Sequence, residues 1–213
     1  MLRYLFYLLV VKPLVSIVLG INVRHRERLI THGSALIVAN HNSHLDALAL
    51  MSLFPQNAIA NVHPVAAADY FLTNRFLKWF ALNIIGIIPI NRNEAASGRD
   101  VLKLVLAALD RNAVLIFFPE GTRGEPENMG RMKNGIASIV AMRPQVPVTP
   151  VFFYGLGKSL PKGEIVLAPF FIDAFVGKPL LWGGNKQDFM AKLNAEMSAL
   201  QEQARQAAAR TED

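Results

Sequence analysis

The sequence predicts an α/β protein in which helices cover a mixed, largely parallel sheet. Strand-like and helix-like runs alternate from Thr31 onward. The run "AVLIFF" (residues 113–118) is apolar throughout, as expected for a central strand covered on both faces. Because 213 residues are enough for one substantial core, we expect residues 31–213 to form one domain. Residues 1–30 are expected to form a membrane-associating helical segment and a basic junction.

The amino-terminal run "MLRYLFYLLVVKPLVSIVLGINV" is nearly long enough to span a bilayer, but Lys12-Pro13 interrupts it. Its Leu, Ile, Phe and Val residues, at about −0.3 to −0.6 kcal/mol each, together outweigh one central lysine at about +3 kcal/mol. Membrane insertion is therefore favoured, either as a span or as a kinked helix within one leaflet. A buried amino-terminal hairpin is the alternative. The following "RHRER" would keep the chain on the cytoplasmic face of the membrane (the inner membrane if bacterial), attracted to anionic lipid.

The remaining elements follow from hydrophobic periodicity and capping signals. We expect strands at residues 34–39, 62–68, 85–90, 113–118, 148–154 and 165–176, and helices at 46–54, 70–83, 98–110, 133–141 and 187–210. Ser97, with Asp100 three residues later, is a candidate cap for the third of these helices. The last helix is rich in Ala and has a spaced apolar stripe, which predicts one face packed on the sheet.

Composition narrows the classes of partner and chemistry. The formal charge of +6 favours an anionic partner, and the 52% hydrophobic content favours a membrane surface over nucleic acid. Aromatic and basic residues are not interleaved as in a single-strand nucleic-acid groove, so we expect no nucleic-acid partner. The absence of cysteine excludes disulfides, thiolate metal sites and a cysteine nucleophile.

Three polar clusters follow the ends of predicted strands: Asn40 to Asp46, Asn91-Arg92, and Glu120 to Arg123. In open α/β sheets, ligands bind beyond the carboxyl ends of the strands. We therefore expect clusters that lie 80 residues apart in the sequence to converge in space.

The first cluster, "NHNSHLD", allows three interpretations. Its histidine at position 41 and aspartate at position 46 would not face each other within one regular helix. If the helix begins near Ser43, however, His41 lies in the preceding loop and can fold back onto Asp46 as a general base. Alternatively, Ser43 and Asp46 form only a capping box, or His41, His44 and Asp46 bind a metal.

The third cluster lies in "FFPEGTRG" and predicts an anion-binding turn. Pro119 ends the strand, and Gly121 permits a tight turn with accessible backbone N–H groups. Glu120 and Arg123 flank the turn, and a guanidinium beside N–H groups is a suitable site for phosphate. A plain salt bridge between Glu120 and Arg123 is the alternative. Arg92 could add a second guanidinium, although a solvated loop arginine is equally compatible with the pattern.

Four motifs in order give the sequence a family resemblance. N-H-x-x-x-x-D is matched by Asn40 to Asp46, and F-P-E-G-T-R is matched in full by Phe118 to Arg123. Gly86 to Arg92 resembles G-x-I-x-I-x-R, and Val146 to Pro150 matches V-P-V-x-P. The chain is therefore similar, over roughly residues 35–180, to the glycerolipid acyltransferase family typified by 1-acyl-sn-glycerol-3-phosphate acyltransferase.

The chain departs from the family pattern at a few positions. Pro89 and Asn91 stand where the family more often has an aromatic or aliphatic residue and an acid. The family's aromatic-Lys-x-Gly after the third motif reads Met132 to Gly135. The first departure lies directly beside Arg92, where the family's acceptor contacts are expected.

The resemblance implies transfer of a fatty acyl group from acyl-CoA or acyl-acyl carrier protein to the free hydroxyl of a lysophospholipid. The expected acceptor is 1-acyl-sn-glycerol 3-phosphate, which would give phosphatidic acid. His41 would be the general base, oriented by Asp46, with no metal, no cofactor and no covalent acyl-enzyme. The residues expected to bind the acceptor are Arg92, Glu120, Gly121, Thr122 and Arg123.

Other functions remain open from the sequence. An acyl thioesterase or lipase-type hydrolase would give the acyl group to water, but the chain has no G-x-S-x-G nucleophile elbow. A different lyso-lipid or glycerol 3-phosphate could be the acceptor for similar machinery. A membrane-binding protein with a degenerate site is the third possibility.

Overall fold

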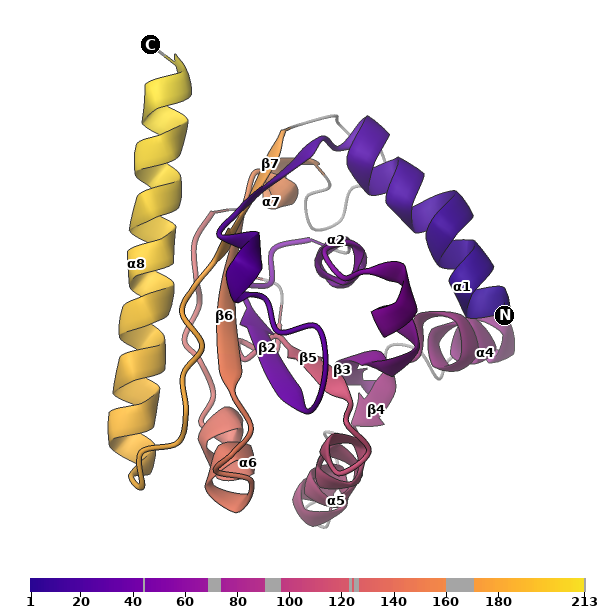
Figure 1. The fold of residues 1–213 in the computed structure, drawn as a ribbon, viewed down its shortest axis with the longest axis vertical. Coiled ribbons are helices and arrows are strands. Elements are labelled where there is room, and N and C mark those ends of the chain that lie inside the picture. Colours follow the sequence, from indigo (N-terminus) through magenta and orange to yellow (C-terminus); the bar gives the residue numbers. More distant parts are fainter. Residues whose placement is uncertain are drawn as a thin grey trace.

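The computed structural model describes residues 1–43, 45–68, 74–90, 97–122, 124, 127–159 and 171–212. Helices pack on both faces of a seven-stranded sheet (Figure 1). The strand order is β1-β7-β6-β2-β5-β3-β4, and every neighbouring pair is parallel except β6 and β7. The expected α/β class with a mixed, largely parallel sheet is confirmed.

The strands are β1 (Ile21–Arg24), β2 (Ala35–Ala39), β3 (Val62–Ala67), β4 (Ile88–Ile90), β5 (Val114–Phe117), β6 (Val148–Tyr154) and β7 (Ile172–Val176). The α-helices are α1 (Leu2–Phe6), α2 (Asp46–Ser52), α4 (Arg75–Phe80), α5 (Ser97–Leu109), α6 (Gly135–Met142), α7 (Leu156–Ser159) and α8 (Lys186–Glu212). Shorter 3-10 and π-helical segments are η1 (Tyr7–Val11), η2 (Leu14–Val18), η3 (Arg26–Arg28), η4 (Gln56–Asn61) and η5 (Ala81–Ile85).

The centre of the sheet is covered on both faces. Successive residues of β2 point to opposite sides, so Ile37 joins the core beneath α2, whereas Leu36 joins the core beneath α5, α6 and α8. All five residues of β2 are buried. The apolar run at 113–118 forms β5, which lies between β2 and β3, as predicted for a central strand.

Strand β1 was not predicted. Residues 21–24 pair in parallel with β7, with Ile21 opposite Ile172, and so they form one edge of the sheet. These residues were expected to belong to the membrane segment and basic junction, because "INV" continues an apolar run and is too short to show its own periodicity. A tertiary partner makes it a strand: the neighbouring β7 supplies the hydrogen bonds.

The first helix is buried along one side and exposed along the other. Tyr7, Val11, Val15 and Leu19 pack on the core, whereas the opposite side of the helix is exposed. The backbone stays helical through Lys12 and Pro13, with wider π turns on both sides. These turns accommodate the proline ring and its missing N–H. The predicted interruption is therefore a local widening of the helix.

Among the described residues, no helix combines the length and the apolarity needed to span a bilayer.

Several other predicted boundaries differ, among them the strand expected from residue 85, which begins at Ile88 because residues 81–85 are helical. The helix expected from residue 70 begins at Arg75, because Asn74 is extended and its side-chain oxygen accepts from Phe76 N and Leu77 N. The last predicted strand, 165–176, is a strand over Ile172–Val176. Residues 69–73 and 160–170, and so the earlier parts of both predictions, lie outside the described residues.

Arg3 attaches the start of the first helix to the sheet. Its guanidinium donates to the backbone oxygens of Ala60 and Val62, beside Gly86. Gly86 has φ +76°, and a methyl group added there would lie 2.6 Å from Arg3 Nη1. A glycine is therefore required at this position both by the backbone conformation and by the close guanidinium.

Gly86→Ala is expected to lower the free energy of unfolding by about 1–3 kcal/mol, because it strains the backbone and displaces Arg3. Urea unfolding measures the loss. Gly33→Ala is the matched control, since Gly33 has φ +74° with nothing within 4 Å of an added methyl group. Equal losses in the two variants would show that the Arg3 contact adds nothing.

Candidate active site

The loop that follows β2 is tied to the neighbouring strand by Asn40. Its buried side chain donates to Phe153 O at 3.0 Å and accepts from Phe153 N at 2.8 Å. The amide thus continues the β2–β6 ladder by one side-chain pair. The position of the next residue, His41, is set by the sheet at the carboxyl end of β2.

His41 and Asp46 are in direct contact. His41 Nδ1 lies 2.7 Å from Asp46 Oδ2, although five residues separate the two in the sequence. Helix α2 begins at Asp46, so the histidine lies in the loop before it and folds back onto the first turn. Because a carboxylate only accepts, Nδ1 carries the proton, which leaves Nε2 with its lone pair. The imidazole is 25% exposed, so a substrate can reach it.

Asp46 also accepts hydrogen bonds from the loop that precedes the helix. Its Oδ2 accepts from Asn42 N at 2.7 Å and from Ser43 N at 2.9 Å, in addition to His41. Burial raises the pKa of Asp46, and these three hydrogen bonds oppose the rise. Oδ1 is buried and has no hydrogen-bond partner among the described residues. One oxygen of Asp46 therefore pairs with His41 and also holds the loop before α2, whereas the N-cap of the helix is Leu45, which makes no side-chain cap hydrogen bond.

The turn after β5 holds the other side of the site. The ring of Phe118 stacks on His41, with ring centroids 4.4 Å apart. Glu120 is buried, and its two oxygens accept from His41 N and Gly130 N, each at 2.9 Å. Burial raises the pKa of Glu120, and the two backbone N–H groups oppose that shift. The first and third clusters therefore converge, because β2 and β5 are parallel neighbours.

The turn itself differs in detail from the expected cradle of N–H groups. Gly121 N donates to Phe118 O at 3.1 Å, so this N–H closes the turn. Thr122 is exposed beside it. Gly121 has φ +76°, and a methyl group there would lie 2.5 Å from Lys133 Nζ. The Lys133 backbone N also donates to Pro119 O.

Lys133 is a candidate binding residue that the sequence analysis did not select. With Arg131, Met132 and Asn134 it lines an open hollow of about 460 Å³ beside the turn. The signal was present in the sequence, because Lys133 is the lysine of the family's aromatic-Lys-x-Gly pattern.

Several residues of the sequence prediction lie outside the described residues: His44, Asn91, Arg92 and Arg123. Their expected roles stay predictions. In the sheet order, β4, which precedes Arg92, is separated from β5 by β3. Among the described residues, no group of three His, Asp or Glu side chains is arranged as a metal site.

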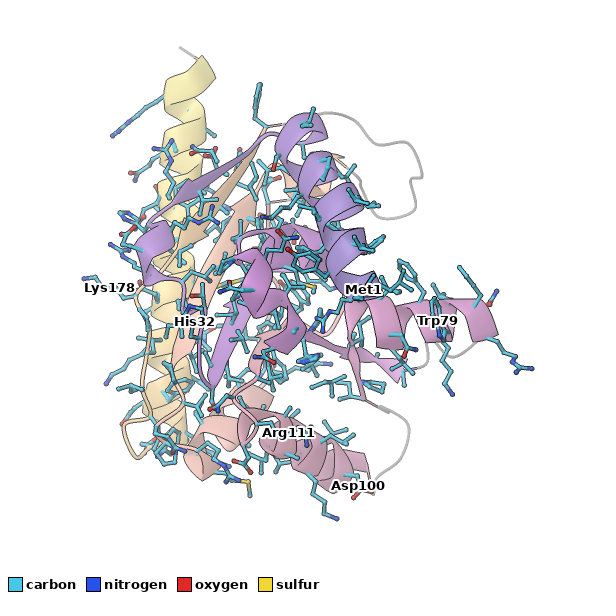
Figure 2. The ribbon with its side chains drawn as sticks, turned by 45° about the vertical axis from the view of Figure 1, so that its right-hand side comes forward. Met1, His32, Trp79, Asp100, Arg111 and Lys178 are labelled. Carbon is cyan, nitrogen blue, oxygen red and sulfur yellow. The ribbon has the colours of Figure 1, made fainter. Side chains whose placement is uncertain are left out.

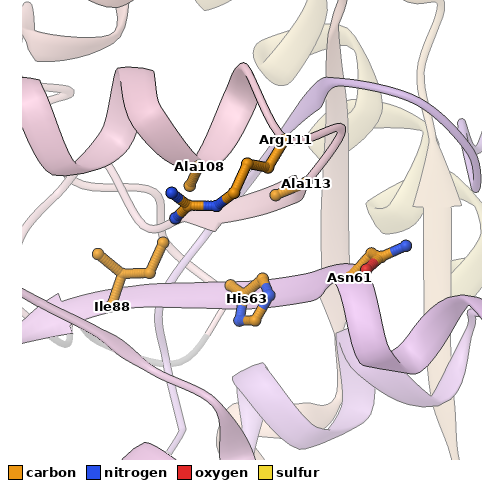
Figure 3. A pocket seen from close by; sticks show the side chains of 6 residues that line it. All are labelled: Asn61, His63, Ile88, Ala108, Arg111 and Ala113. Carbon is orange, nitrogen blue, oxygen red and sulfur yellow. The ribbon is translucent and has the colours of Figure 1, made fainter.

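A second cavity lies at the other end of the strands, away from His41. About 320 Å³ in volume, it is lined by Asn61, His63, Ile88, Ala108, Arg111 and Ala113 (Figure 3). Asn61 and Ala113 precede β3 and β5, so the cavity is at the amino ends of these strands, whereas His41 follows the carboxyl end of β2. Burial lowers the pKa of His63. This cavity is not part of the candidate active site.

Comparison with known proteins agrees with the four motifs. The family model described as Acyltransferase matches residues 20–154, a range that includes β1, the His41–Asp46 pair and the turn after β5. The chain belongs to this acyltransferase family.

Curated relatives in the family carry one recurring name. The chloroplastic 1-acyl-sn-glycerol-3-phosphate acyltransferase of Arabidopsis thaliana is 31% identical over 80% of this chain. The corresponding enzyme BAT2 of Brassica napus is 30% identical over 72% of this chain. The matches cover 46% and 42% of these two proteins, so the chain spans less than half of each.

A solved structure has the same fold. The 1-acyl-sn-glycerophosphate acyltransferase PlsC from Thermotoga maritima aligns with a TM-score of 0.67 and 17% identity. The alignment covers 85% of this chain and 71% of that one. The two proteins therefore share the arrangement of the sheet and its helices.

Proposed function

We propose that this acyltransferase moves a fatty acyl group from acyl-CoA or acyl-acyl carrier protein to the free hydroxyl of 1-acyl-sn-glycerol 3-phosphate, giving phosphatidic acid. The observation that carries the proposal is the His41–Asp46 contact, in which a buried carboxylate orients a solvent-accessible imidazole. The names of the curated relatives support the choice of acceptor.

The reaction follows from the protonation states of the pair. His41 Nε2 takes the proton of the acceptor hydroxyl as its oxygen attacks the thioester carbonyl. Asp46 stabilises the imidazolium that forms, because the two groups remain 2.7 Å apart. The tetrahedral intermediate then collapses, the carbon–sulfur bond breaks, and the imidazolium returns the proton to the leaving thiolate. The products are the new ester and the free thiol.

The phosphate of the acceptor needs cations near the turn after β5. Arg92 and Arg123 are the residues that the resemblance implies for this role. Lys133 adds a third cation, whose ammonium group lies against Gly121. Gly121 belongs to the same turn as Glu120, which accepts a hydrogen bond from His41 N. Charge-assisted contacts to a phosphate would hold the glycerol hydroxyl close to the imidazole.

Arg123→Ala is expected to weaken acceptor binding by about 1.5–3 kcal/mol, because a hydrogen bond to a charged group is lost. Steady-state kinetics with each substrate varied in turn measures this as a rise in the acceptor KM. A rise confined to the donor KM would contradict the assignment of Arg123 to the acceptor phosphate. Arg210→Ala, on the last turn of α8, is the control for the loss of one positive charge.

The first helix is the proposed membrane contact of the enzyme, on the cytoplasmic face. Its outward side exposes large apolar residues, among them Leu9 at 67% and Ile17 at 80%. An exposed apolar helix side next to a basic segment is suited to the surface of an anionic membrane. A lipid acceptor would then be available in the leaflet, while the thioester donor arrives from the aqueous side.

A panel of lyso-lipids with one labelled acyl donor tests the proposed function. We expect a labelled diacyl product, and thiol release that depends strongly on the acceptor. Thiol release at the same rate without any acceptor would indicate a hydrolase instead. Vesicle binding without labelled product from any acceptor would indicate a non-enzymatic membrane protein, and a preference within the panel would identify the headgroup.

A further inference from the structure

The side of the first helix that faces away from the core is apolar. Every fourth residue from Tyr7 to Leu19 is buried, so the helix is fixed with one side on the core. The opposite side exposes Leu2, Leu5 and Leu9, and a water-facing helix side would carry polar residues there. Its orientation is fixed further by Arg3, which donates to Ala60 O.

A second element, the continuous helical run α4–η5, extends this apolar surface. Phe76 is 71% exposed, and Trp79 and Leu82 on the same side are also exposed, at spacings of three residues. No residue of α4 is buried, so burial in the protein core does not account for its aromatic residues.

The two elements are in contact. Phe80 meets Phe6 edge to face, with ring centroids 5.2 Å apart, and α1 packs against η5. Figures 1 and 2 show α1 and α4 side by side, with Met1 and Trp79 on the same side of the molecule. We call the apolar set Leu2, Leu5, Leu9, Phe76, Trp79 and Leu82 the outer apolar surface.

The charged residues of the first helix and of α4 are all basic. Residues 1–26 and 74–90 contain no Asp or Glu, whereas Lys12, Arg75 and Lys78 lie on the helices themselves and Arg3 is bound to the backbone oxygens of Ala60 and Val62. An apolar surface flanked by cations alone complements a leaflet with anionic headgroups. Trp is also enriched where protein meets the headgroup region of a bilayer.

We propose that α4–η5 is a second membrane-docking element, which rests with the first helix on an anionic bilayer and places Phe76 and Trp79 among the headgroups. The occupant of the outer apolar surface is thus a lipid leaflet. The proposed docking element rests on the proposed function only in taking the acceptor to be a membrane lipid, and the fluorescence and sedimentation tests do not depend on acyl transfer.

Trp79 can report on its own environment. The chain has two tryptophans, so Trp182→Phe leaves Trp79 as the single fluorophore. With vesicles of equal parts phosphatidylcholine and phosphatidylglycerol, we expect its emission to shift to the blue and to be quenched by lipids brominated near the headgroup. The reciprocal variant Trp79→Phe leaves Trp182, which packs against Phe189 of α8, and its emission should not change.

Unchanged Trp79 emission in protein that sediments with these vesicles would overturn the proposal, because the first helix alone would then hold the membrane. A shift that grows with protein concentration and needs no vesicles would overturn it in favour of a second copy of the chain as the occupant.

Vesicle sedimentation of the double variant Phe76→Ser, Trp79→Ser gives an independent measure. We expect its partitioning onto the same vesicles to be weaker by roughly tenfold or more. Leu104→Ser on α5 is the matched control, with 51% exposure of an apolar side chain outside the outer apolar surface. Equal partitioning of the double variant and the control would overturn the proposal.

A turnover assay distinguishes loss of membrane docking from a failure of the proposed function. With a short-chain acceptor dissolved as monomers, the double variant should retain wild-type turnover, because neither residue touches His41 or Asp46 in the structure. Loss of vesicle binding with retained turnover supports a docking role. Absence of turnover in the wild type as well would count against the proposed function and leave the fluorescence result standing.

Discussion

Replacing His41 by alanine is expected to lower turnover by about 10²–10⁴-fold, because the variant lacks the proposed general base for the acceptor hydroxyl. The fold should survive the change. The ring is 25% exposed and contributes one stacking contact, with Phe118. Asp46 Oδ2 would keep its two bonds from the backbone N–H groups of Asn42 and Ser43.

Single-turnover and steady-state assays, combined with thermal unfolding, separate chemistry from stability. His32→Ala, at an exposed histidine before β2, is the control and should leave turnover unchanged. A well-folded His41→Ala protein with the kcat of the wild type would reject the role of His41 as the base.

Asp46→Asn is expected to lower turnover by about 10²-fold or more, because the imidazolium loses the carboxylate that stabilises it. The asparagine oxygen can still accept from His41 Nδ1, so the loss measures charge more than position. The amide nitrogen would take the place of Oδ1, which is buried and has no partner among the described residues. An unpaired donor there should also cost about 1–3 kcal/mol of stability.

Ser43→Ala is the control that separates capping from catalysis. The hydroxyl of Ser43 accepts from Leu45 N at 3.3 Å, whereas the bond to Asp46 comes from the Ser43 backbone N–H, which alanine keeps. We expect this variant to lose up to about 2 kcal/mol of stability and to keep nearly all of its turnover. If Asp46→Asn showed the same mild kinetic change as Ser43→Ala, Asp46 would be a capping residue alone.

Much of the fold could be predicted because its local patterns are strong. The long apolar run at β5 has the composition of a strand covered on both faces, and it lies inside the sheet. The stripe of α8, which buries Phe189, Leu193 and Met197, follows from helical periodicity. Strand β1 and the start of α4 were missed for opposite reasons. Strand β1 forms only because β7 pairs with it, whereas the first residue of α4 is set locally by the N-cap at Asn74.

The residue types of the candidate site could be predicted from the sequence, but their hydrogen-bond partners could not. Spacing alone left capping, pairing and metal binding open for Asp46, because a carboxylate at the start of a helix suits all three. Glu120 was expected to bind the acceptor, yet both its oxygens accept from backbone N–H groups of the protein. Lys133 matches the lysine of the family's aromatic-Lys-x-Gly pattern, but only the structure places its ammonium group against Gly121.

The sequence by itself determined the α/β class, the family and the residue types of the candidate active site, because strand and helix periodicity and contiguous motifs are local properties of the chain. Only the tertiary structure decided that one oxygen of Asp46 holds both His41 and the backbone N–H groups of the loop before α2, and that Glu120 supports the histidine from the turn after a neighbouring strand. It also decided which side of α4 stays uncovered. Those outcomes depend on which segments the sheet brings together, and the parallel register of β2 and β5 joins residues that are 79 positions apart.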